Sequence, residues 1–242
     1  IVIFTLGWLQ RWPAGEWQVA QCDVGQGDSL VINLGADRAI VIDVGPEPVA
    51  EDKCLKNLGI KEIPLLILSH FHADHVGGLS GLLQSRKVGQ VWISNNLEPL
   101  LESTHSLSLL SKSTVVTVQK GLVSQIAGIQ FEVLWPENMT RNFEAMPGEG
   151  SQINNSSIAM IVSTADWSIF TAGDLEPPAQ HEILGSVRAV DIYKVCHHGS
   201  KYQDEELMSA LSAQIAVISV GAKNSYGHPA PEAIASLTRL GT

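Results

Sequence analysis

Histidines at the ends of predicted strands are the feature of this sequence that most restricts its fold. Six of the eight histidines fall in three short clusters, and each cluster directly follows an apolar run with strand character. Random placement would scatter these side chains along the chain. Their arrangement therefore indicates a functional site built at the ends of strands.

The first cluster reads His70-Phe71-His72-Ala73-Asp74-His75 and follows the continuous apolar run 64–68. Such a run predicts a strand buried on both faces. Imidazoles two residues apart on an extended turn can point toward one ion, while a carboxylate and an imidazole at the start of the next helix face a second ion. A polar loop with incidental histidines is the alternative.

Asp174 ends another apolar strand, where its two carboxylate oxygens can bridge two cations. Taken alone, such an aspartate is as typical of a helix N-cap. His197 and His198 follow a third strand, and they can present one imidazole to a metal and the other to a substrate phosphate. His228, in Tyr-Gly-His-Pro, is a candidate general acid or phosphate contact, with a plain surface position as the alternative.

Two further carboxylates follow or flank strands of the first half. Asp43 ends the apolar run 40–42, and Asp28 closes a Gly-Gln-Gly turn. Capping of a turn is the simplest role for such residues. We expect Asp43 and Asp28 to stand behind the metal ligands, where a carboxylate fixes the tautomer and orientation of a metal-bound histidine.

Apolar periodicity predicts two halves, each with strands followed by strand and helix units. Strands are expected at 18–22, 29–34, 39–44, 64–68, 88–93 and 114–118, then at 129–135, 158–163, 168–172, 191–195 and 215–220. Helices are expected at 50–58, 76–84, 99–110, 178–184, 204–211 and 231–240. The stretch 137–156 has no periodicity and reads as a functional loop.

Composition limits what the chain can bind. It carries 15 Lys and Arg against 25 Asp and Glu, a net charge of −10, and 45% of its 242 residues are hydrophobic. Residues 1–180 hold 19 acidic and 10 basic residues, net −9, and residues 181–242 hold 6 and 5, net −1. A broad nucleic-acid-binding surface needs an excess of basic residues. Contact with a nucleic acid is therefore confined to a local site.

Cysteine usage and the first residues complete the description of the chain. Cys22, Cys54 and Cys196 are odd in number and show no paired spacing, so we expect neither a disulfide scaffold nor a cysteine metal site. Residues 1–9 form an apolar run, and tryptophans stand at positions 8, 12 and 17. Residues 1–16 are expected to be the cut end of a membrane helix or a juxtamembrane segment, with an ordinary first strand as the alternative. No secretory signal is recognisable.

These motifs resemble the metallo-β-lactamase superfamily, which implies an α/β fold of αββα four-layer sandwich type over residues 17–242. More narrowly, they resemble the C-terminal domain of the ComEC family of bacterial DNA-uptake channel proteins. The motifs that carry this resemblance are Asp23-Val24-Gly25-Gln26-Gly27-Asp28, Asn154-Asn155-Ser156-Ser157, Gly173-Asp174, Val195-Cys196-His197-His198-Gly199-Ser200 and Tyr226-Gly227-His228-Pro229.

The resemblance implies a metal-dependent nuclease that degrades the strand of DNA not taken up, on the outer face of the cell membrane. Its implied partners are single-stranded DNA, the membrane channel of the same parent protein and other DNA-uptake proteins. One departure from the superfamily pattern concerns its third histidine, because His105 falls in a predicted helix and the corresponding loop holds Asn155. An amide oxygen suits Mn²⁺ better than Zn²⁺.

The hypothesis is hydrolysis of phosphodiester bonds with two divalent ions, Mn or Zn. One ion is assigned to His70 and His72 and the other to Asp74, His75 and His198, with Asp174 shared and Asp74 also catalytic. The remaining side chains are assigned to contact the substrate phosphate or to protonate the leaving oxygen. They are His197, His228, Asn155, Ser200 and Lys201.

Two other readings use the same residues. The first keeps the site and changes the substrate to a small molecule, a cell-wall phosphodiester, a lactam or a thioester. The second is a non-catalytic module that guides DNA, and the missing histidine motivates it.

Overall fold

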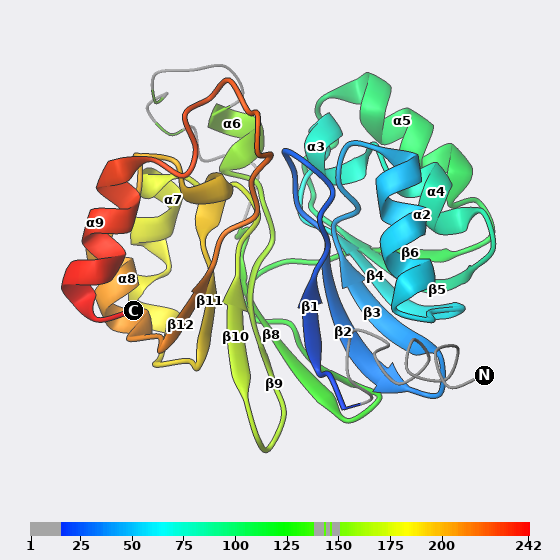
Figure 1. The fold of residues 1–242 in the computed structure, drawn as a ribbon, viewed down its shortest axis with the longest axis horizontal. Helices are drawn as coiled ribbons and strands as arrows, with labels where there is room; N and C mark the ends of the chain where they lie inside the picture. The colour runs from blue at the N-terminus through cyan, green and yellow to red at the C-terminus, as the bar shows by residue number, and fades with distance from the viewer. Residues whose placement is uncertain (1–15, 138–142, 144–145, 147–150) are drawn as a thin grey trace, which may run out of the picture.

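Two six-stranded sheets pack face to face and carry helices on their outer faces (Figure 1). The computed structural model describes residues 16–137, 143, 146 and 151–242. The first sheet has the order β1-β2-β3-β4-β5-β6. Its strands are β1 (Val19–Gln21), β2 (Leu30–Gly35), β3 (Arg38–Ile42), β4 (Glu62–Leu68), β5 (Lys87–Ile93) and β6 (Thr114–Thr117).

The second sheet repeats this plan with the order β12-β11-β10-β9-β8-β7. Its strands are β7 (Val123–Ile126), β8 (Ile129–Trp135), β9 (Ala159–Ser163), β10 (Ser168–Thr171), β11 (Ile192–Lys194) and β12 (Ile215–Val217). In each sheet antiparallel strands come first, and the later strands, β3 to β6 and β10 to β12, pair in parallel. The carboxyl ends of these parallel strands lie at one edge of each sheet.

Helices cover the outer faces. In the first half these are α2 (Pro48–Asn57), α3 (Ala73–Val76), α4 (Leu79–Leu83) and α5 (Leu100–Leu109). In the second half they are α6 (Ser151–Asn154), α7 (Pro177–Glu182), α8 (Glu205–Leu211) and α9 (Pro231–Leu240), with short 3-10 turns at Leu184–Ser186 and Cys196–Gly199. Each sheet packs an apolar face against these helices, for example Leu66 against Leu82 in the first half and Phe170 against Leu211 in the second.

The central core lies between the sheets. Ile40 and Leu65 of the first sheet share one buried cluster with Phe131 and Met160 of the second. The alternate residues of β3 and β4, including Val41 and Leu66, face the helices instead. The predicted αββα four-layer sandwich is confirmed, because strands buried on both faces need a layer on either side.

The predicted helix at 76–84 is wrong in its bounds. It is divided into α3 and α4 at Gly77 and Gly78, where the amide of Gly78 donates to the carbonyl of Gly45 at 2.7 Å rather than continuing the helix. A Cβ at Gly78 would overlap the carbonyl oxygen of Val44. The glycine pair therefore lets the segment after β3 cross close to the helix that bears the first histidine cluster.

Three other predicted bounds differ from the structure. The strand β7 has no counterpart among the predictions, since its sequence Val-Ser-Gln-Ile is neither a continuous apolar run nor an alternating one. The strand predicted at 215–220 ends at Val217, and the chain then turns toward the histidines. Within the loop predicted at 137–156, α6 forms one helical turn; most of 138–150 lies outside the described residues.

A disulfide joins Cys22, just after β1, to Cys54 in α2. The expectation that the cysteines form no disulfide was wrong. The two residues are 32 positions apart and meet only because α2 packs on the outer face of the first sheet beside the end of β1. Spacing along the chain carries no signal for such a pair. Cys196 is a buried free thiol.

The membrane segment expected at 1–16 lies, apart from Glu16, outside the described residues. Among the helices that the structure describes, none is long and apolar enough to cross a membrane.

Candidate metal centre

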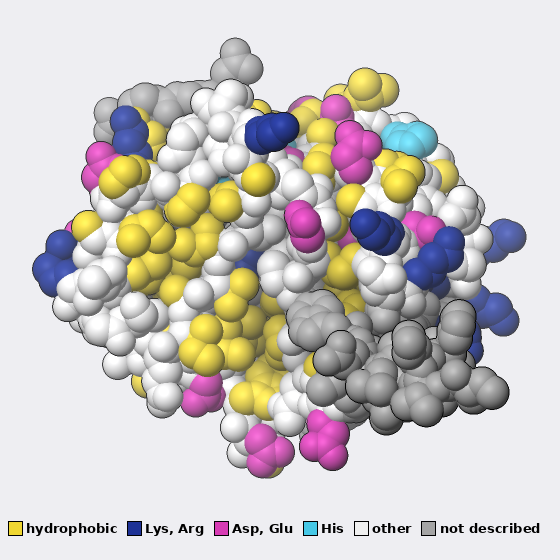
Figure 2. Space-filling model, viewed as in Figure 1, with side chains coloured by type: hydrophobic (Ala, Val, Ile, Leu, Met, Phe, Trp, Pro, Cys, Tyr) yellow, Lys and Arg dark blue, Asp and Glu magenta, His cyan; other side chains and the backbone are white. Residues whose placement is uncertain are grey.

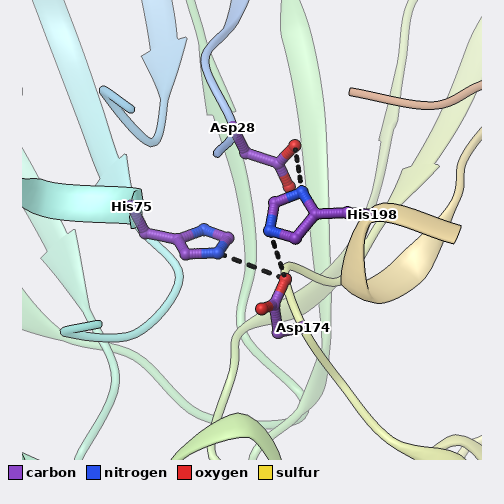
Figure 3. A group of neighbouring side chains, drawn as sticks. All are labelled: Asp28, His75, Asp174 and His198. Carbon is purple, nitrogen blue, oxygen red and sulfur yellow. Dashed lines mark ion pairs between the residues drawn. The ribbon is translucent and has the colours of Figure 1, made fainter. Parts of the chain in front are cut away.

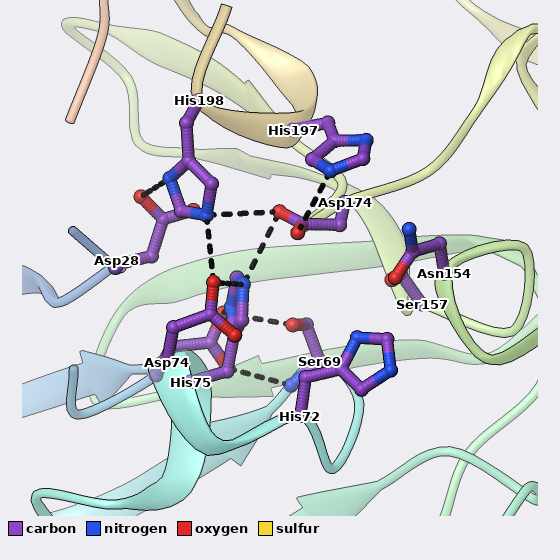
Figure 4. Close-up of polar contacts among 12 residues, drawn as sticks. Asp28, Ser69, His72, Asp74, His75, Asn154, Ser157, Asp174, His197 and His198 are labelled. Atoms are coloured by element: carbon purple, nitrogen blue, oxygen red, sulfur yellow. Dashed lines mark hydrogen bonds and ion pairs between the residues drawn. The ribbon is translucent and has the colours of Figure 1, made fainter. Parts of the chain in front are cut away.

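The predicted site residues converge at the edge where strands of both sheets end. Asp43 follows β3 and His70 follows β4, both in the first half. Asp174 follows β10 and His198 follows β11, both in the second half. Figure 4 shows Asp174 and His198 of the second half facing Asp74 and His75 of the first. Carboxyl ends of parallel strands are where α/β folds commonly build their sites.

Asp43 fixes the position of His75. It adopts a left-handed backbone conformation, with φ 59°, and its carboxylate accepts hydrogen bonds from the amide of Ser69 at 2.7 Å and from the Ser69 hydroxyl at 2.8 Å. The same carboxylate lies 2.9 Å from Nδ1 of His75. A proton held on Nδ1 leaves Nε2 as the free nitrogen, and Nε2 points at Asp174, 3.2 Å away.

His198 is held in the same manner from the opposite half. Its Nδ1 donates to the carbonyl of Ser219 at 3.0 Å, with the Asp28 carboxylate 3.5 Å away. Its Nε2 faces Asp74 at 3.3 Å and Asp174 at 3.4 Å. Both His197 and His198 have positive φ, 48° and 53°, so backbone strain is stored beside the site.

Asp28 carries a second contact behind His198. Its carboxylate pairs with the buried ammonium of Lys194 at 2.7 Å. Burial raises the pKa of Asp28, but the charge of Lys194 and that of His198 outweigh it and hold the pKa well below its usual range.

Charges at the centre of the site are strongly coupled. Burial raises the pKa of Asp174, yet the imidazoles of His198 and His75 hold it well below its usual range. Burial lowers the pKa of His198, but Asp174 and Asp28 raise it to about 10. The pKa of His75 is likewise raised well above its ordinary value by Asp174 and Asp74, against the effect of burial. Ionised carboxylates thus face positive charge across the gap.

These residues fit a divalent cation. Asp28, His75, Asp174 and His198 each offer one ligand atom, and the four atoms lie within 4.8 Å of one another (Figure 3). Nε2 of His75 and Oδ1 of Asp174 are buried and have no hydrogen-bond partner of acceptable geometry among the described residues. Buried polar atoms without such partners are typical of a site that an ion completes.

The fourth ligand is better supplied by Asp74 than by Asp28. Asp28 lies on the Nδ1 side of His198 and is occupied by Lys194, whereas Asp74 lies on the Nε2 side, which faces His75 and Asp174. Asp28 therefore stands behind His198 as Asp43 stands behind His75. Imidazole and carboxylate ligands of this kind suit Zn²⁺ and Mn²⁺.

The second predicted ligand pair lies next to this group. Nε2 of His70 lies 3.1 Å from Nδ1 of His72, and the hydroxyls of Ser69 and Ser157 approach Nδ1 of His70 at 3.1 and 3.3 Å. Burial and then the charge of His75 lower the pKa of His70 well below its ordinary value. Burial also lowers the pKa of His72. Both imidazoles are therefore neutral, whereas His75 and His198 would each have to release a proton to bind a cation.

Asn154, rather than Asn155, faces the cleft beside this pair. The Asn155 side chain accepts from the amide of Glu176 at 3.2 Å and is turned into the protein. Asn154 donates to the Glu176 carboxylate at 3.0 Å, and its side-chain oxygen has no hydrogen-bond partner of acceptable geometry among the described residues. Asn154 therefore occupies the position in the cleft that was expected for Asn155. His105 is exposed on α5 and does not line the cleft.

A cleft of about 560 Å³ opens over these residues, and its walls come from both halves. His197 and His228 line it as expected, with ring centroids 5.7 Å apart. Burial, then the charges of His197 and His198, lower the pKa of His228 to about 4. A neutral imidazole can donate one N–H to a phosphate but holds no second proton at pH 7, which favours the phosphate-contact role.

Ser200 and Lys201 do not line the cleft. Ser200 is buried with its hydroxyl near the amide of Tyr202, and the Lys201 ammonium lies 5.0 Å from the centre of the Tyr202 ring. The cleft also includes three residues with polar side chains and no predicted role, Gln26, Asn154 and Tyr226. All three lie inside motifs that the sequence singled out, so the signal was present, but neighbouring residues were assigned the roles.

Comparisons with known proteins agree with this geometry. The family model of the metallo-β-lactamase superfamily matches residues 22–142, half of the chain. ComE operon protein 3 of Bacillus subtilis is 32% identical over 251 aligned positions, which cover 93% of this chain and 31% of that protein. Competence protein ComA of Neisseria gonorrhoeae is 25% identical and is matched over 90% of this chain and 29% of its own length.

Among solved structures, Tm1679, a metal-dependent hydrolase of the β-lactamase superfamily, superposes with a TM-score of 0.57. The match covers 91% of each chain at 15% sequence identity, a level that shows the fold alone. The chain spans less than a third of the length of the curated relatives named above.

Proposed function

Because this chain belongs to the metallo-β-lactamase superfamily and has the fold of its metal-dependent hydrolases, we propose that it is a phosphodiesterase that cleaves single-stranded DNA. The observation that carries the proposal is the convergence of Asp74, His75, Asp174 and His198 from both halves. Asp74, Asp174 and His198 line an open cleft, and His75 is buried against Asp174. An open cleft admits a polymer, and its floor fits a divalent cation.

Each group of residues has a defined part in this reaction. His75, His198, Asp74 and Asp174 would hold one ion, and His70 and His72, with Asn154 beside them, would hold a second. Divalent cations bound there lower the pKa of water and neutralise charge on phosphate oxygens. Asp43 and Asp28 keep the two central imidazoles in the required tautomer and orientation.

His197 and His228 complete the proposed site above the ions. Nε2 of His197 lies 3.6 Å from Asp174, and the ring centroid of His228 lies 5.7 Å from that of His197. Both residues line the cleft, where they would contact the oxygens of a phosphate. Hydrolysis breaks one P–O bond, transfers the elements of water across it and leaves a phosphate monoester and a hydroxyl.

DNA as the substrate is supported by the relatives, since one of them is named as a competence protein. The chain spans under a third of these relatives. We therefore propose that the whole protein is a DNA-uptake protein that adds a membrane channel to this domain and works with other uptake proteins. The substrate would be the strand that is not transported.

The disulfide supports the proposed location. Disulfides persist in oxidising surroundings and are rare in the cytosol. The bond between Cys22 and Cys54 therefore favours a domain on the outer face of the cell membrane.

The test replaces Asp174 by Asn, which keeps the size of the side chain but removes the charge that faces His75 and His198. Asp166→Asn, on the exposed turn between β9 and β10, is the matched control. We expect single-stranded DNA cleavage with Mn²⁺ or Zn²⁺ to fall at least about 100-fold in Asp174→Asn and to be unchanged in the control.

Cleavage of a chromogenic phosphodiester without cleavage of DNA would support phosphodiester hydrolysis and refute DNA as the substrate. Hydrolysis of a lactam alone would refute phosphodiester chemistry. Full DNA cleavage by Asp174→Asn would refute the assigned site.

A further inference from the structure

An exposed aromatic ring stands at the rim of the cleft. Tyr226 lines the cleft, yet 72% of the residue is exposed to solvent. Its ring lies 5.9 Å from that of His228 with an angle of 29° between the planes. The ring of His228 in turn lies 6.5 Å from that of His198, at 28°. Three rings, each tilted by no more than 29° from the next, therefore lead from solvent to the candidate metal centre.

The loop that carries Tyr226 is held in place along its length. The amide of Gly221 donates to the side chain of Gln26 at 3.0 Å, which ties the start of the loop to the first half. The amide of Ala230 donates to the carbonyl of Gly199 at 2.8 Å and ties its end to the turn that bears His198.

Asn224 organises the interior of the same loop. Its side-chain oxygen accepts from the amides of Tyr226 and His228, both at 3.1 Å, and its nitrogen donates to the carbonyl of His228 at 2.8 Å. These bonds fix the backbone at Tyr226 and His228, and the Tyr226 ring lies against that of His228. An exposed ring that is already oriented loses little conformational entropy when a flat ligand binds to it.

We propose that Tyr226 is the stacking platform for a nucleobase of the single-stranded substrate, next to the phosphate that is cleaved. This inference rests on the proposed function and specifies how the site holds its substrate. The chain has a net charge of −10, so it lacks the broad electrostatic attraction by which most nucleic-acid-binding proteins hold the backbone. Stacking of a base on an aromatic ring supplies affinity without added positive charge and tolerates every base.

The test compares two labelled strands with the same backbone, oligodeoxythymidylate and a fully abasic strand of equal length. Binding to the 242-residue chain is measured by fluorescence anisotropy in EDTA, so that it does not depend on cleavage. The variants are Tyr226→Ala and Tyr226→Phe, and the second keeps an aromatic ring as the matched control. KM and kcat for both strands are then measured with Mn²⁺.

We expect the wild type and Tyr226→Phe to bind the thymidylate strand about tenfold more tightly than the abasic strand, and Tyr226→Ala to bind both equally. KM for the thymidylate strand should rise by a similar factor in Tyr226→Ala, while kcat changes little. Equal binding of both strands by the wild type would overturn the inference. So would an equal loss for both strands in Tyr226→Ala, which would mark Tyr226 as structural.

The binding measurement also separates this inference from the proposed function. Preference for the thymidylate strand without any cleavage would support the stacking platform and refute the nuclease. Cleavage of both strands with the same KM would support the nuclease and refute the platform.

Discussion

Glu51 is a buried acid whose ionisation opposes folding. It is fully buried in α2, and neither of its carboxylate oxygens has a hydrogen-bond partner of acceptable geometry among the described residues. Burial raises its pKa from 4.5 to about 8, and the nearby Ser29 hydroxyl and Arg86 guanidinium offset only part of that effect. Below pH 4.5 this side chain is protonated in the folded and the unfolded state.

The unfolded state ionises first as the pH rises, so stability from this group falls between pH 4.5 and about 8 and then levels off. The shift corresponds to about 5 kcal/mol of unfolding free energy. Glu51→Gln should remove this slope and be the more stable protein above pH 8. Urea denaturation at pH 5 and pH 8.5 measures the change in the free energy of unfolding, and Glu62→Gln, at an exposed position, is the control. A wild-type slope retained in Glu51→Gln would contradict the assignment.

Individual site residues differ in how far the sequence could predict them. His70, His72, Asp74 and His75 stand within six positions after one strand, so local geometry alone brings them together. The choice between Asn154 and Asn155 depends on α6, a single helical turn that decides which of two adjacent amides faces the cleft. Such a turn leaves no period in the sequence.

At the scale of elements, the Cys22–Cys54 disulfide ties the strand before Asp28 to helix α2. Its loss enlarges the conformational freedom of the unfolded chain, and a closed loop of this length is worth about 3 to 4 kcal/mol. The double variant Cys22→Ser/Cys54→Ser should therefore unfold at a lower urea concentration than the oxidised wild type. Reduction of the wild type should lower its midpoint to that of the variant.

Thiol counting tests the same bond directly. The denatured but unreduced protein should show one reactive thiol, Cys196, and the reduced protein should show three. Three reactive thiols before reduction would contradict the disulfide.

Elements with a strong period were the most predictable. The buried strand β4 and the amphipathic helix α9 lie close to the predicted positions. Burial on both faces gives the strand a continuous apolar run, and burial on one face gives the helix a regular apolar period. The division between α3 and α4 was missed because it depends on a backbone crossing at Gly78, a contact with Val44 that is distant in the chain.

At the scale of the whole molecule, charge predicts how the proposed DNA binding would respond to salt. On the face shown in Figure 2, the described Lys and Arg side chains are scattered among acidic and apolar ones and form no continuous band. Each phosphate neutralised on a single strand contributes about −0.7 to the slope of log affinity against log salt concentration. A site that contacts one or two phosphates should give a slope of about −1.

Fluorescence anisotropy measures this slope between about 20 and 200 mM KCl, with strands of two lengths. A local site gives the same slope for both lengths. A slope that grows steeply with strand length would reveal an extended binding surface.

Both halves contribute to the same small group of atoms, which makes the site sensitive to their alignment. Advancing one strand by a single residue moves its side chains by about 3.3 Å. That step is as large as the 3.2 Å that separates Asp174 from His75. A slip of one sheet over the other by one residue would therefore pull the ligands apart while the apolar interface still found contacts. The side chains packed between the sheets, such as Ile40 and Phe131, thus keep the two halves of the candidate metal centre aligned.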